Sequence, residues 1–369
     1  MLEISKNLRR IADKVLDNAL PIQKDELVVF FAGQHNLDLA FAFAAACEVR
    51  GIETLVRSWG DYITESRLRE APIEVFSRTP KLQKALVDAA DWIVYMGIIY
   101  DSSMYQDPVI QARLPEISRA SKWSSDHLLQ LCLEKKTHLV GFLDPSLQQA
   151  ETLGKTFQET REMFLGSLDI DYYALTEFGQ RIIEIMREGG EIHLTCPKGS
   201  NLKLCADGRH WINDDGKIDP ASEDSAEFGK FIHNLPVGEV FVAPIEDSAH
   251  GKIYPIDFPG STTKGYCIEF KGKEQAVISA KEGVELIKAN LEKATGNPYC
   301  IAEFAFGTNP CSDMLLATEK AYATCHVAIG QNTWLGGQNE CSIHWDFLIE
   351  KPTVTIDKAL IIKNGQYMV

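Results

Sequence analysis

The chain has 369 residues, which exceeds the roughly 100–200 residues of an ordinary domain and therefore predicts two domains. Hydrophobic residues make up 45% and charged residues 24% of the sequence, and this balance excludes a disordered or fibrous protein. The net charge of −15 repels phosphate backbones and anionic lipids, so we expect neither nucleic acid nor a membrane surface as a partner.

The cysteines and the start of the chain indicate a cytoplasmic protein. Nine cysteines are scattered without a C-x-x-C pair, which is not the spacing of a disulfide scaffold or a cysteine-based zinc module. A reducing compartment is therefore expected. The first sixteen residues carry charges throughout, and no stretch of about 18 residues is continuously apolar, so we expect no signal peptide and no transmembrane helix.

The first half of the chain alternates helical and strand patterns. Apolar residues at helical spacing start near Ile4, and short continuous apolar runs of strand length follow. Such strands separated by helices predict an α/β domain with a mainly parallel sheet, over residues 1–185. Neither G-x-G-x-x-G nor a P-loop follows any strand, so no nucleotide cofactor is predicted. The predicted strands are 27–32, 53–59, 92–98 and 137–144, and the predicted helices include 4–15, 37–50 and 81–90.

The second half has a different pattern. After a helix at 175–190, short strands with Asp-Gly and Asn-Gly turns dominate, and one helix at 281–296 interrupts them. This pattern predicts a strand-rich α+β catalytic domain over residues 186–369. Its predicted strands include 191–196, 201–208, 209–216, 238–244 and 353–369.

The segment SIHWDFLI contains the clearest chemical signal. On a strand, alternate side chains share a face, so His344 and Asp346 project together while Trp345 points to the other side. An imidazole and a carboxylate placed in this way form a pair of metal ligands. The alternative interpretation is a structural His–Asp hydrogen bond at a sheet edge.

Three further strands each carry one ionisable residue. His326 shares its face of ATCHVAIG with small residues, which leaves room beside the imidazole. Glu303 is the single charge in CIAEFAFG, and Glu239 enters the apolar strand GEVFVAP. A buried carboxylate must be protonated, paired or bound to metal. The alternatives are a packed core histidine and glutamates at edges that face water.

A single explanation accounts for all five residues if they converge. Two glutamates, two histidines and one aspartate suit Zn²⁺, Co²⁺ or Mn²⁺. Five side chains exceed the set that one catalytic zinc takes, so we predict two divalent cations at Glu239, Glu303, His326, His344 and Asp346. Such a pair suits amide hydrolysis. Two nearby segments, NDDGK at 213–217 and EDSAHG at 246–251, are interpreted as turns, and the second could also support the site.

These motifs resemble the aminopeptidase T and aminopeptidase S family of dinuclear metallopeptidases. Segments similar to GEVFVAP and EFAFGTNP carry the family's metal-binding glutamates, which correspond to Glu239 and Glu303. A segment similar to EKAYATCHVAIG corresponds to His326, and one similar to GGQNECSIHWD corresponds to His344 and Asp346. The similarity runs through most of the chain and is most specific from about residue 190 onward.

The resemblance implies a two-domain homodimer with two divalent ions. It implies removal of an N-terminal residue from a peptide or small amide by a metal-bridged water, with Glu303 bridging the ions or accepting the proton. Glu319 could be a further or outer ligand. The family's tyrosine, thought to stabilise the oxyanion, is absent from GQNTWLGG, where Thr333 and Trp334 stand instead.

Two other functions remain open. The 2,5-dihydroxypyridine dioxygenases resemble the same domain but bind one Fe(II) through two histidines and one aspartate. In that branch a histidine stands at the position of Glu303, whereas the present chain keeps the hydrolase residues. A third interpretation is a relative that has lost catalysis and acts as a binding protein.

Overall fold

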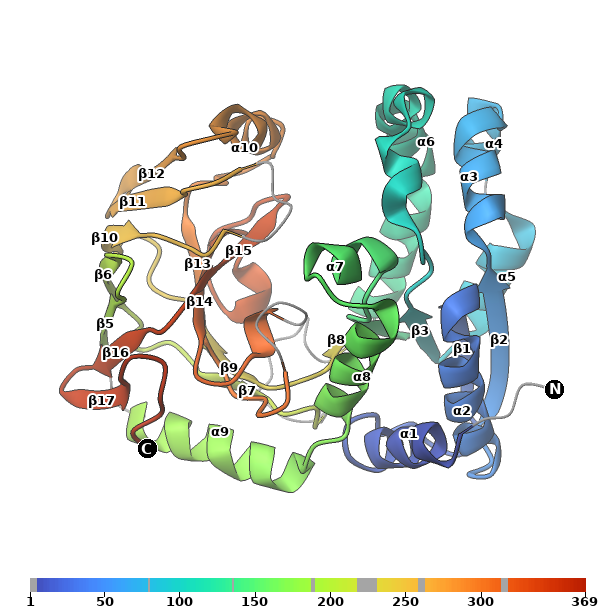
Figure 1. Cartoon of the computed structure of the whole chain (residues 1–369), viewed down its shortest axis with the longest axis horizontal. Coiled ribbons are helices and arrows are strands. Elements are labelled where there is room, and N and C mark those ends of the chain that lie inside the picture. Colours follow the sequence, from blue (N-terminus) through green and yellow to red (C-terminus); the bar gives the residue numbers. More distant parts are fainter. Residues whose placement is uncertain are drawn as a thin grey trace. The chain divides into compact units, whose positions relative to one another are not determined.

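The computed structural model divides into two compact units (Figure 1). The first runs to Asp169 and includes strand β8; the second contains Ile170–Asp215 and Val237–Val369. This division differs from the one expected at residues 185 and 186, because the predicted helix near residue 175 packs with the second unit. The described residues are 5–78, 80–134, 136–186, 190–217, 231–257, 263–312 and 318–369.

A parallel five-stranded sheet forms the centre of the first unit. Its order is β2-β1-β3-β4-β8, and every neighbouring pair is parallel. Four of these strands were predicted from their apolar runs. The fifth strand, β8, follows three strands of the second unit in the sequence. Its short, partly polar sequence IHNL did not predict a strand. The strands are β1 (Leu27–Gly33), β2 (Glu53–Trp59), β3 (Trp92–Met96), β4 (His138–Phe142) and β8 (Ile232–Leu235).

Helices cover both faces of this sheet. Phe31 of β1 belongs to a cluster with Val87 of α5, whereas the neighbouring Phe30 packs against Phe43 of α2 on the opposite face. The predicted α/β domain with a parallel sheet is therefore confirmed. The helices are α1 (Lys6–Asn18), α2 (Leu37–Glu48), α3 (Asp61–Glu70), α4 (Ile73–Ser77), α5 (Lys81–Ala89), α6 (Pro108–Leu133), α7 (Leu147–Thr152) and α8 (Phe157–Leu168).

The second unit contains two antiparallel sheets. Their orders are β12-β11-β10-β6-β5-β16-β17 and β15-β14-β13-β9-β7. Helix α9 (Tyr172–Met186) packs against β7 and β9, and α10 is Val284–Leu291. The predicted strand-rich domain is confirmed. The strands are β5 (Glu191–Thr195), β6 (Asn201–Cys205), β7 (Ile212–Asp214), β9 (Glu239–Val242), β10 (His250–Ile253), β11 (Cys267–Lys271), β12 (Glu274–Ser279), β13 (Ile301–Gly307), β14 (Cys325–Gly330), β15 (His344–Ile349), β16 (Thr353–Ile356) and β17 (Ala359–Ile362).

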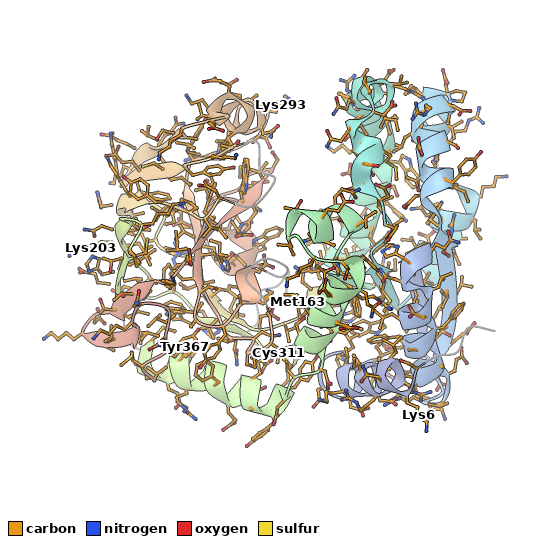
Figure 2. The ribbon with its side chains drawn as sticks, in the orientation of Figure 1. Lys6, Met163, Lys203, Lys293, Cys311 and Tyr367 are labelled. Carbon is orange, nitrogen blue, oxygen red and sulfur yellow. The ribbon has the colours of Figure 1, made fainter. Side chains whose placement is uncertain are left out.

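One apolar core joins the two sheets. Phe304 and Phe306 of β13 and Val327 of β14 lie in it, together with residues of β5, β6 and β11. Near the C-terminus, Tyr367 donates a hydrogen bond of 2.8 Å to the carbonyl of Gly307 and so holds the end of β13 (Figure 2). Side chains alternate along a strand, so the face of the β15-β14-β13-β9-β7 sheet that points away from this core can carry polar groups.

Within the described part of the chain, no helix is both long and apolar enough to cross a bilayer.

The first prediction concerns the acid stability of the first unit. Asp169, at the end of α8, binds Arg10 and Lys14 of α1, and the Arg10 guanidinium lowers the pKa of Asp169 to about 2. The pKa of Asp169 in the folded protein lies below its ordinary value of 3.8. The stabilisation that its ion pairs give the folded state is therefore complete above about pH 4 and is lost as the pH falls through about 2. Asp169→Asn should cost on the order of 1 kcal/mol of unfolding free energy at pH 7.

Urea unfolding at several pH values measures this effect. The difference between Asp169→Asn and the parent chain should shrink as the pH falls below 4 and vanish only below about pH 2, while Asp126→Asn, which removes an exposed carboxylate, should change little at any pH. An equal loss in both variants would contradict the assignment.

Candidate metal centre

The five predicted ligands lie on one face of the antiparallel five-stranded sheet of the second unit, β15-β14-β13-β9-β7. The apolar core lies against the other face of this sheet. In the register, Glu303 of β13 stands opposite Ala328 of β14, and Ala328 stands opposite Asp346 of β15. His326 is paired with Ala305 of β13. The remaining two ligands face glycines, since Glu239 is paired with Gly307 and His344 with Gly330.

Each predicted ligand therefore has an alanine or a glycine as a cross-strand neighbour, and in one row an alanine separates two of them. Directly opposed Cβ atoms are about 4.5–5.5 Å apart, so two ligands on either side of an alanine can reach towards each other above it. Ala328 has this position between Glu303 and Asp346. The small side chain of Ala328 leaves space above the centre of the sheet that an ion or a water molecule could occupy.

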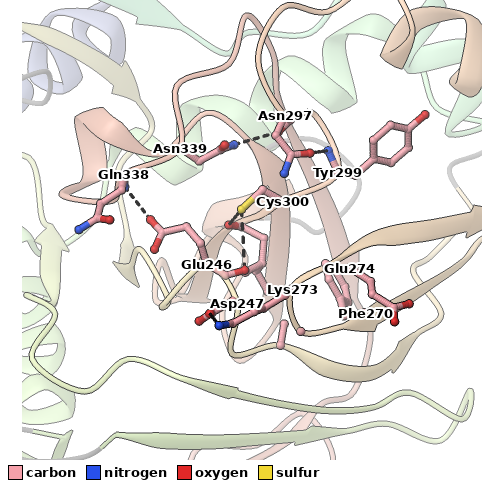
Figure 3. A pocket seen from close by; sticks show the side chains of 13 residues that line it. Glu246, Asp247, Phe270, Lys273, Glu274, Asn297, Tyr299, Cys300, Gln338 and Asn339 are labelled. Atoms are coloured by element: carbon pink, nitrogen blue, oxygen red, sulfur yellow. Dashed lines mark hydrogen bonds and ion pairs between the residues drawn. The ribbon is translucent and has the colours of Figure 1, made fainter.

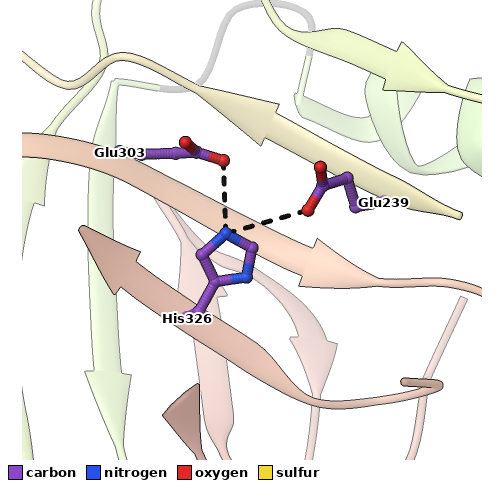
Figure 4. Close-up of side chains that lie close together, drawn as sticks. All are labelled: Glu239, Glu303 and His326. Atoms are coloured by element: carbon purple, nitrogen blue, oxygen red, sulfur yellow. Dashed lines mark hydrogen bonds and ion pairs between the residues drawn. The ribbon is translucent and has the colours of Figure 1, made fainter. Parts of the chain in front are cut away.

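The first group of ligands consists of Glu239, Glu303 and His326 (Figure 4). The Nε2 atom of His326 lies 3.2 Å from Oε1 of Glu303 and 3.7 Å from Oε2 of Glu239. All three residues are buried, with exposed fractions of 8% for Glu239 and 6% for Glu303. The alternative that either glutamate faces water is thereby excluded. We call this group the His326 half-site.

The second group consists of Glu303, His344 and Asp346, which we call the His344 half-site. The Nε2 atom of His344 lies 3.1 Å from Oε2 of Glu303 and 3.3 Å from Oδ1 of Asp346. Glu303 thus belongs to both half-sites and directs one oxygen towards each imidazole. A carboxylate shared in this way is the arrangement that two neighbouring divalent cations require.

The orientation of His344 is fixed by the main chain. Its Nδ1 atom donates a hydrogen bond of 2.7 Å to the carbonyl oxygen of Gln331. This bond places the proton of the neutral ring on Nδ1 and turns the lone pair of Nε2 towards the carboxylates of Glu303 and Asp346. Histidines that bind metals are commonly held in this way.

The ionisable groups of the two half-sites shift one another's pKa values. Burial lowers the pKa of His344, but the carboxylates of Asp346 and Glu303, which accept from its ring, outweigh burial and raise the pKa to about 11. The pKa of His326 is raised to about 9 because Glu303 likewise outweighs burial. Burial also raises the pKa of Glu303, yet the two imidazoles hold it well below its usual range. The carboxylates of Glu303 and Asp346 thus favour a positive charge beside the two Nε2 atoms.

Unsatisfied atoms support the same conclusion. Oε2 of Glu239 is buried without a hydrogen-bond partner, and burial raises the pKa of Glu239 to about 8. Leaving a buried carboxylate oxygen unpaired is costly. A divalent cation between Glu239 and His326 would satisfy it, so the residues fit the predicted pair of ions. That they act as metal ligands stays a prediction.

Lys320 is a buried charged residue beside the candidate site that the sequence analysis did not identify. Its ammonium, 3% exposed, binds Oε1 of Glu239 and lies 3.0 Å from Asp214 and 3.6 Å from Glu319. Asp214, from the segment interpreted as a turn, is on β7 directly opposite Glu239. Glu319 lies in neither half-site and contacts Lys320 instead. A lysine so deeply buried indicates a fixed charge network, but its position in the sequence carries no such signal.

The segment between β14 and β15 is anchored by Glu246. This residue accepts hydrogen bonds from Arg209, from the side chain of Asn332 and from the backbone of Gln338. Residues 331–341 carry the carbonyl that orients His344, so Glu246 of EDSAHG holds the segment beside this predicted ligand. That EDSAHG supports the site stays a prediction. Glu246 also lines a pocket of about 360 Å³ together with Asp247, Asn297 and Tyr299, and none of the five predicted ligands contributes to that lining (Figure 3).

Thr333 and Trp334 lie in the stretch where the resembling family is expected to have a tyrosine. The ring of Trp334 lies 5.5 Å from that of His344, at an angle of 59°. Thr333 points its hydroxyl to the side chain of Gln331, which donates to it at 2.7 Å. An indole is therefore the aromatic group beside the predicted ligands.

Comparison with known proteins agrees with the geometry. A sequence model of the thermophilic metalloproteases (M29) matches residues 4–367. Aminopeptidase PepS of Streptococcus thermophilus is 25% identical over 48% of this chain and 49% of its own length, so the chain spans about half of that relative. Aminopeptidase AmpS of Bacillus subtilis (strain 168) is 18% identical over the full length of both proteins. The resemblance inferred from the motifs is confirmed.

Two solved structures share the fold. Wild-type AmpT from Thermus thermophilus superposes with a TM-score of 0.76, at 19% identity, over the whole of both chains. The 2,5-dihydroxypyridine dioxygenase from Pseudomonas putida KT2440 has a TM-score of 0.61 at 12% identity, over 99% of this chain and 98% of its own. Identities this low establish a common fold and leave the chemistry to the site residues.

The second prediction tests the room above the sheet. Ala328→Leu adds three carbons between Glu303 and Asp346 and should abolish binding of at least one divalent ion, although every predicted ligand is kept. Elemental analysis of purified protein measures the loss. Ala328→Gly keeps the space and should retain the metal of the parent chain. Full metal content in Ala328→Leu would show that ions do not lie over this part of the sheet.

Proposed function

Because the chain belongs to the thermophilic metalloproteases (M29), we propose that it is an aminopeptidase that removes the N-terminal residue from a peptide or small amide. The observation that carries the proposal is the sharing of Glu303 between two groups of three ligands. One group alone would serve a single ion. Two groups joined by a carboxylate favour a dinuclear centre.

The donor set defines which ions are suitable. Two imidazoles with three carboxylates favour Zn²⁺, Co²⁺ or Mn²⁺. When bound, two such ions supply a water of lowered pKa and polarise the scissile carbonyl. The ligands in the His326 half-site are Glu239, Glu303 and His326, and those in the His344 half-site are Glu303, His344 and Asp346.

The protein's own groups then have distinct roles. Glu303 is the catalytic residue, because its carboxylate touches both half-sites and can accept a proton from a water attacking there. The hydrogen bond to the Gln331 carbonyl keeps His344 in one orientation. Trp334, beside His344, supplies an aromatic surface where the resembling family has a phenol, so oxyanion stabilisation falls to other groups.

The cellular setting is part of the same proposal. We infer a cytoplasmic homodimer that acts on peptides and takes neither nucleic acid nor membrane as a partner. The net charge of −15 supports the last two points, and the free state of all nine cysteines is compatible with a reducing compartment.

The third prediction is metal dependence. Protein purified without a histidine tag should contain about two Zn, Co or Mn ions per chain. Chelation should abolish release of arylamine from aminoacyl-arylamides, and the same ions should restore it. One iron per chain, with oxygen uptake on a hydroxylated pyridine, would instead identify a dioxygenase. Absence of metal and of both activities would favour a binding protein.

The fourth prediction concerns the shared carboxylate. Glu303→Gln should lower kcat on an aminoacyl-arylamide by about a thousandfold or more, because it removes the carboxylate that bridges the ions or accepts the proton. Glu269→Gln on β11, in the other sheet, is the matched control and should keep kcat within about twofold. Activity in Glu303→Gln close to that of the control would contradict the catalytic role.

A further inference from the structure

The two half-sites are unequal in their supporting contacts. In the His344 half-site the imidazole is held by the Gln331 carbonyl at 2.7 Å. In the His326 half-site the corresponding Nδ1 atom of His326 is buried and has no hydrogen-bond partner. An imidazole with a fixed tautomer and orientation is the better metal ligand. This difference alone favours the His344 half-site for the first ion.

A second difference is the fixed positive charge beside Glu239. The ammonium of Lys320 binds one oxygen of this carboxylate directly. For Asp346, the ion pairs within the described residues are with His326 and His344, at 3.9 and 3.3 Å. A cation entering the His326 half-site therefore meets a carboxylate that is already partly neutralised, and it is repelled by the ammonium.

Lys320 cannot readily move aside. Its side chain is 3% exposed, and Asp214, at 3.0 Å, holds the ammonium from the other side. The backbone carbonyl of Lys320 accepts a hydrogen bond of 2.9 Å from Asn309, which fixes the segment before β14. Charges at this depth are weakly screened, so their effect on a neighbouring ion is large.

We propose that Lys320 is an internal counter-ion and positioning residue that makes the His326 half-site the weaker of the two. The inference rests on the proposed dinuclear centre. The first divalent ion enters the His344 half-site, and the second enters the His326 half-site at a higher free-metal concentration. Lys320 orients Glu239 and balances its charge before the second ion arrives. The availability of metal ions then sets the fraction of chains that hold both.

Titration of the metal-free full-length protein with Co²⁺ tests the proposal. Visible absorption and calorimetry should resolve two steps whose dissociation constants differ by about tenfold or more. His344→Ala should remove the tighter step and His326→Ala the weaker one. A single step that binds two equivalent ions would overturn the proposal, as would loss of the tighter step in His326→Ala.

Charge variants then separate the role of Lys320 from a structural one. Lys320→Met should tighten the weaker step about tenfold, because repulsion of the second ion is removed. Asp214→Asn should weaken the same step, since the ammonium of Lys320 then loses one of its three carboxylate partners and keeps Glu239 and Glu319. Lys198→Met, which removes an exposed lysine of the same unit, is the control and should change neither step. A weaker second step in Lys320→Met would overturn the counter-ion role.

Two further measurements keep the test decisive. If Lys320→Met does not fold, Asp214→Asn still tests the proposal, because it removes a negative charge beside the same ammonium. An unchanged second binding step in Asp214→Asn would overturn the proposal. The titration uses no substrate, so failure to cleave aminoacyl-arylamides would contradict the proposed function alone. Equal affinities in an active peptidase would contradict the present inference alone.

Discussion

The burial of Glu303 in the middle of an antiparallel sheet is the constraint on which the site depends. A carboxylate that is 6% exposed cannot remain charged without partners, and its two oxygens lie 3.2 and 3.1 Å from two imidazoles. The adjacent strand β14 supplies His326 and the next strand, β15, supplies His344, because the side chains of all three strands alternate with the same period. The alternation of side chains along these strands therefore produces both the apolar core on one face of the sheet and the polar cluster on the other.

That pattern explains why much of the site could be predicted from the sequence. Period-two alternation places His344 and Asp346 on one face without any knowledge of the fold, and it separates His326 from Cys325. A charged residue within an apolar strand identifies Glu303. Convergence of separate strands is not a local property, however, and only the motifs resembling a known family connected all four strands in advance.

The missed features depend on long-range contacts. Lys320 and Asp214 are 106 positions apart, and nothing in NDDGK indicates that its first aspartate would meet a buried lysine. Strand β8 joins the sheet of the first unit after the chain has already formed strands of the second. The long helix α6 contains Pro115, which weakens a helical prediction, and its stability comes from packing against α3 and α4.

The central claim is that two cations lie on either side of Glu303. Crystals of the zinc-loaded protein, measured on both sides of the zinc absorption edge, test it most directly. The account predicts two anomalous peaks about 3.5–4 Å apart, one bound by Glu239 and His326 and the other by His344 and Asp346. A single peak in the fully loaded protein, or peaks that do not contact Glu303, would contradict it.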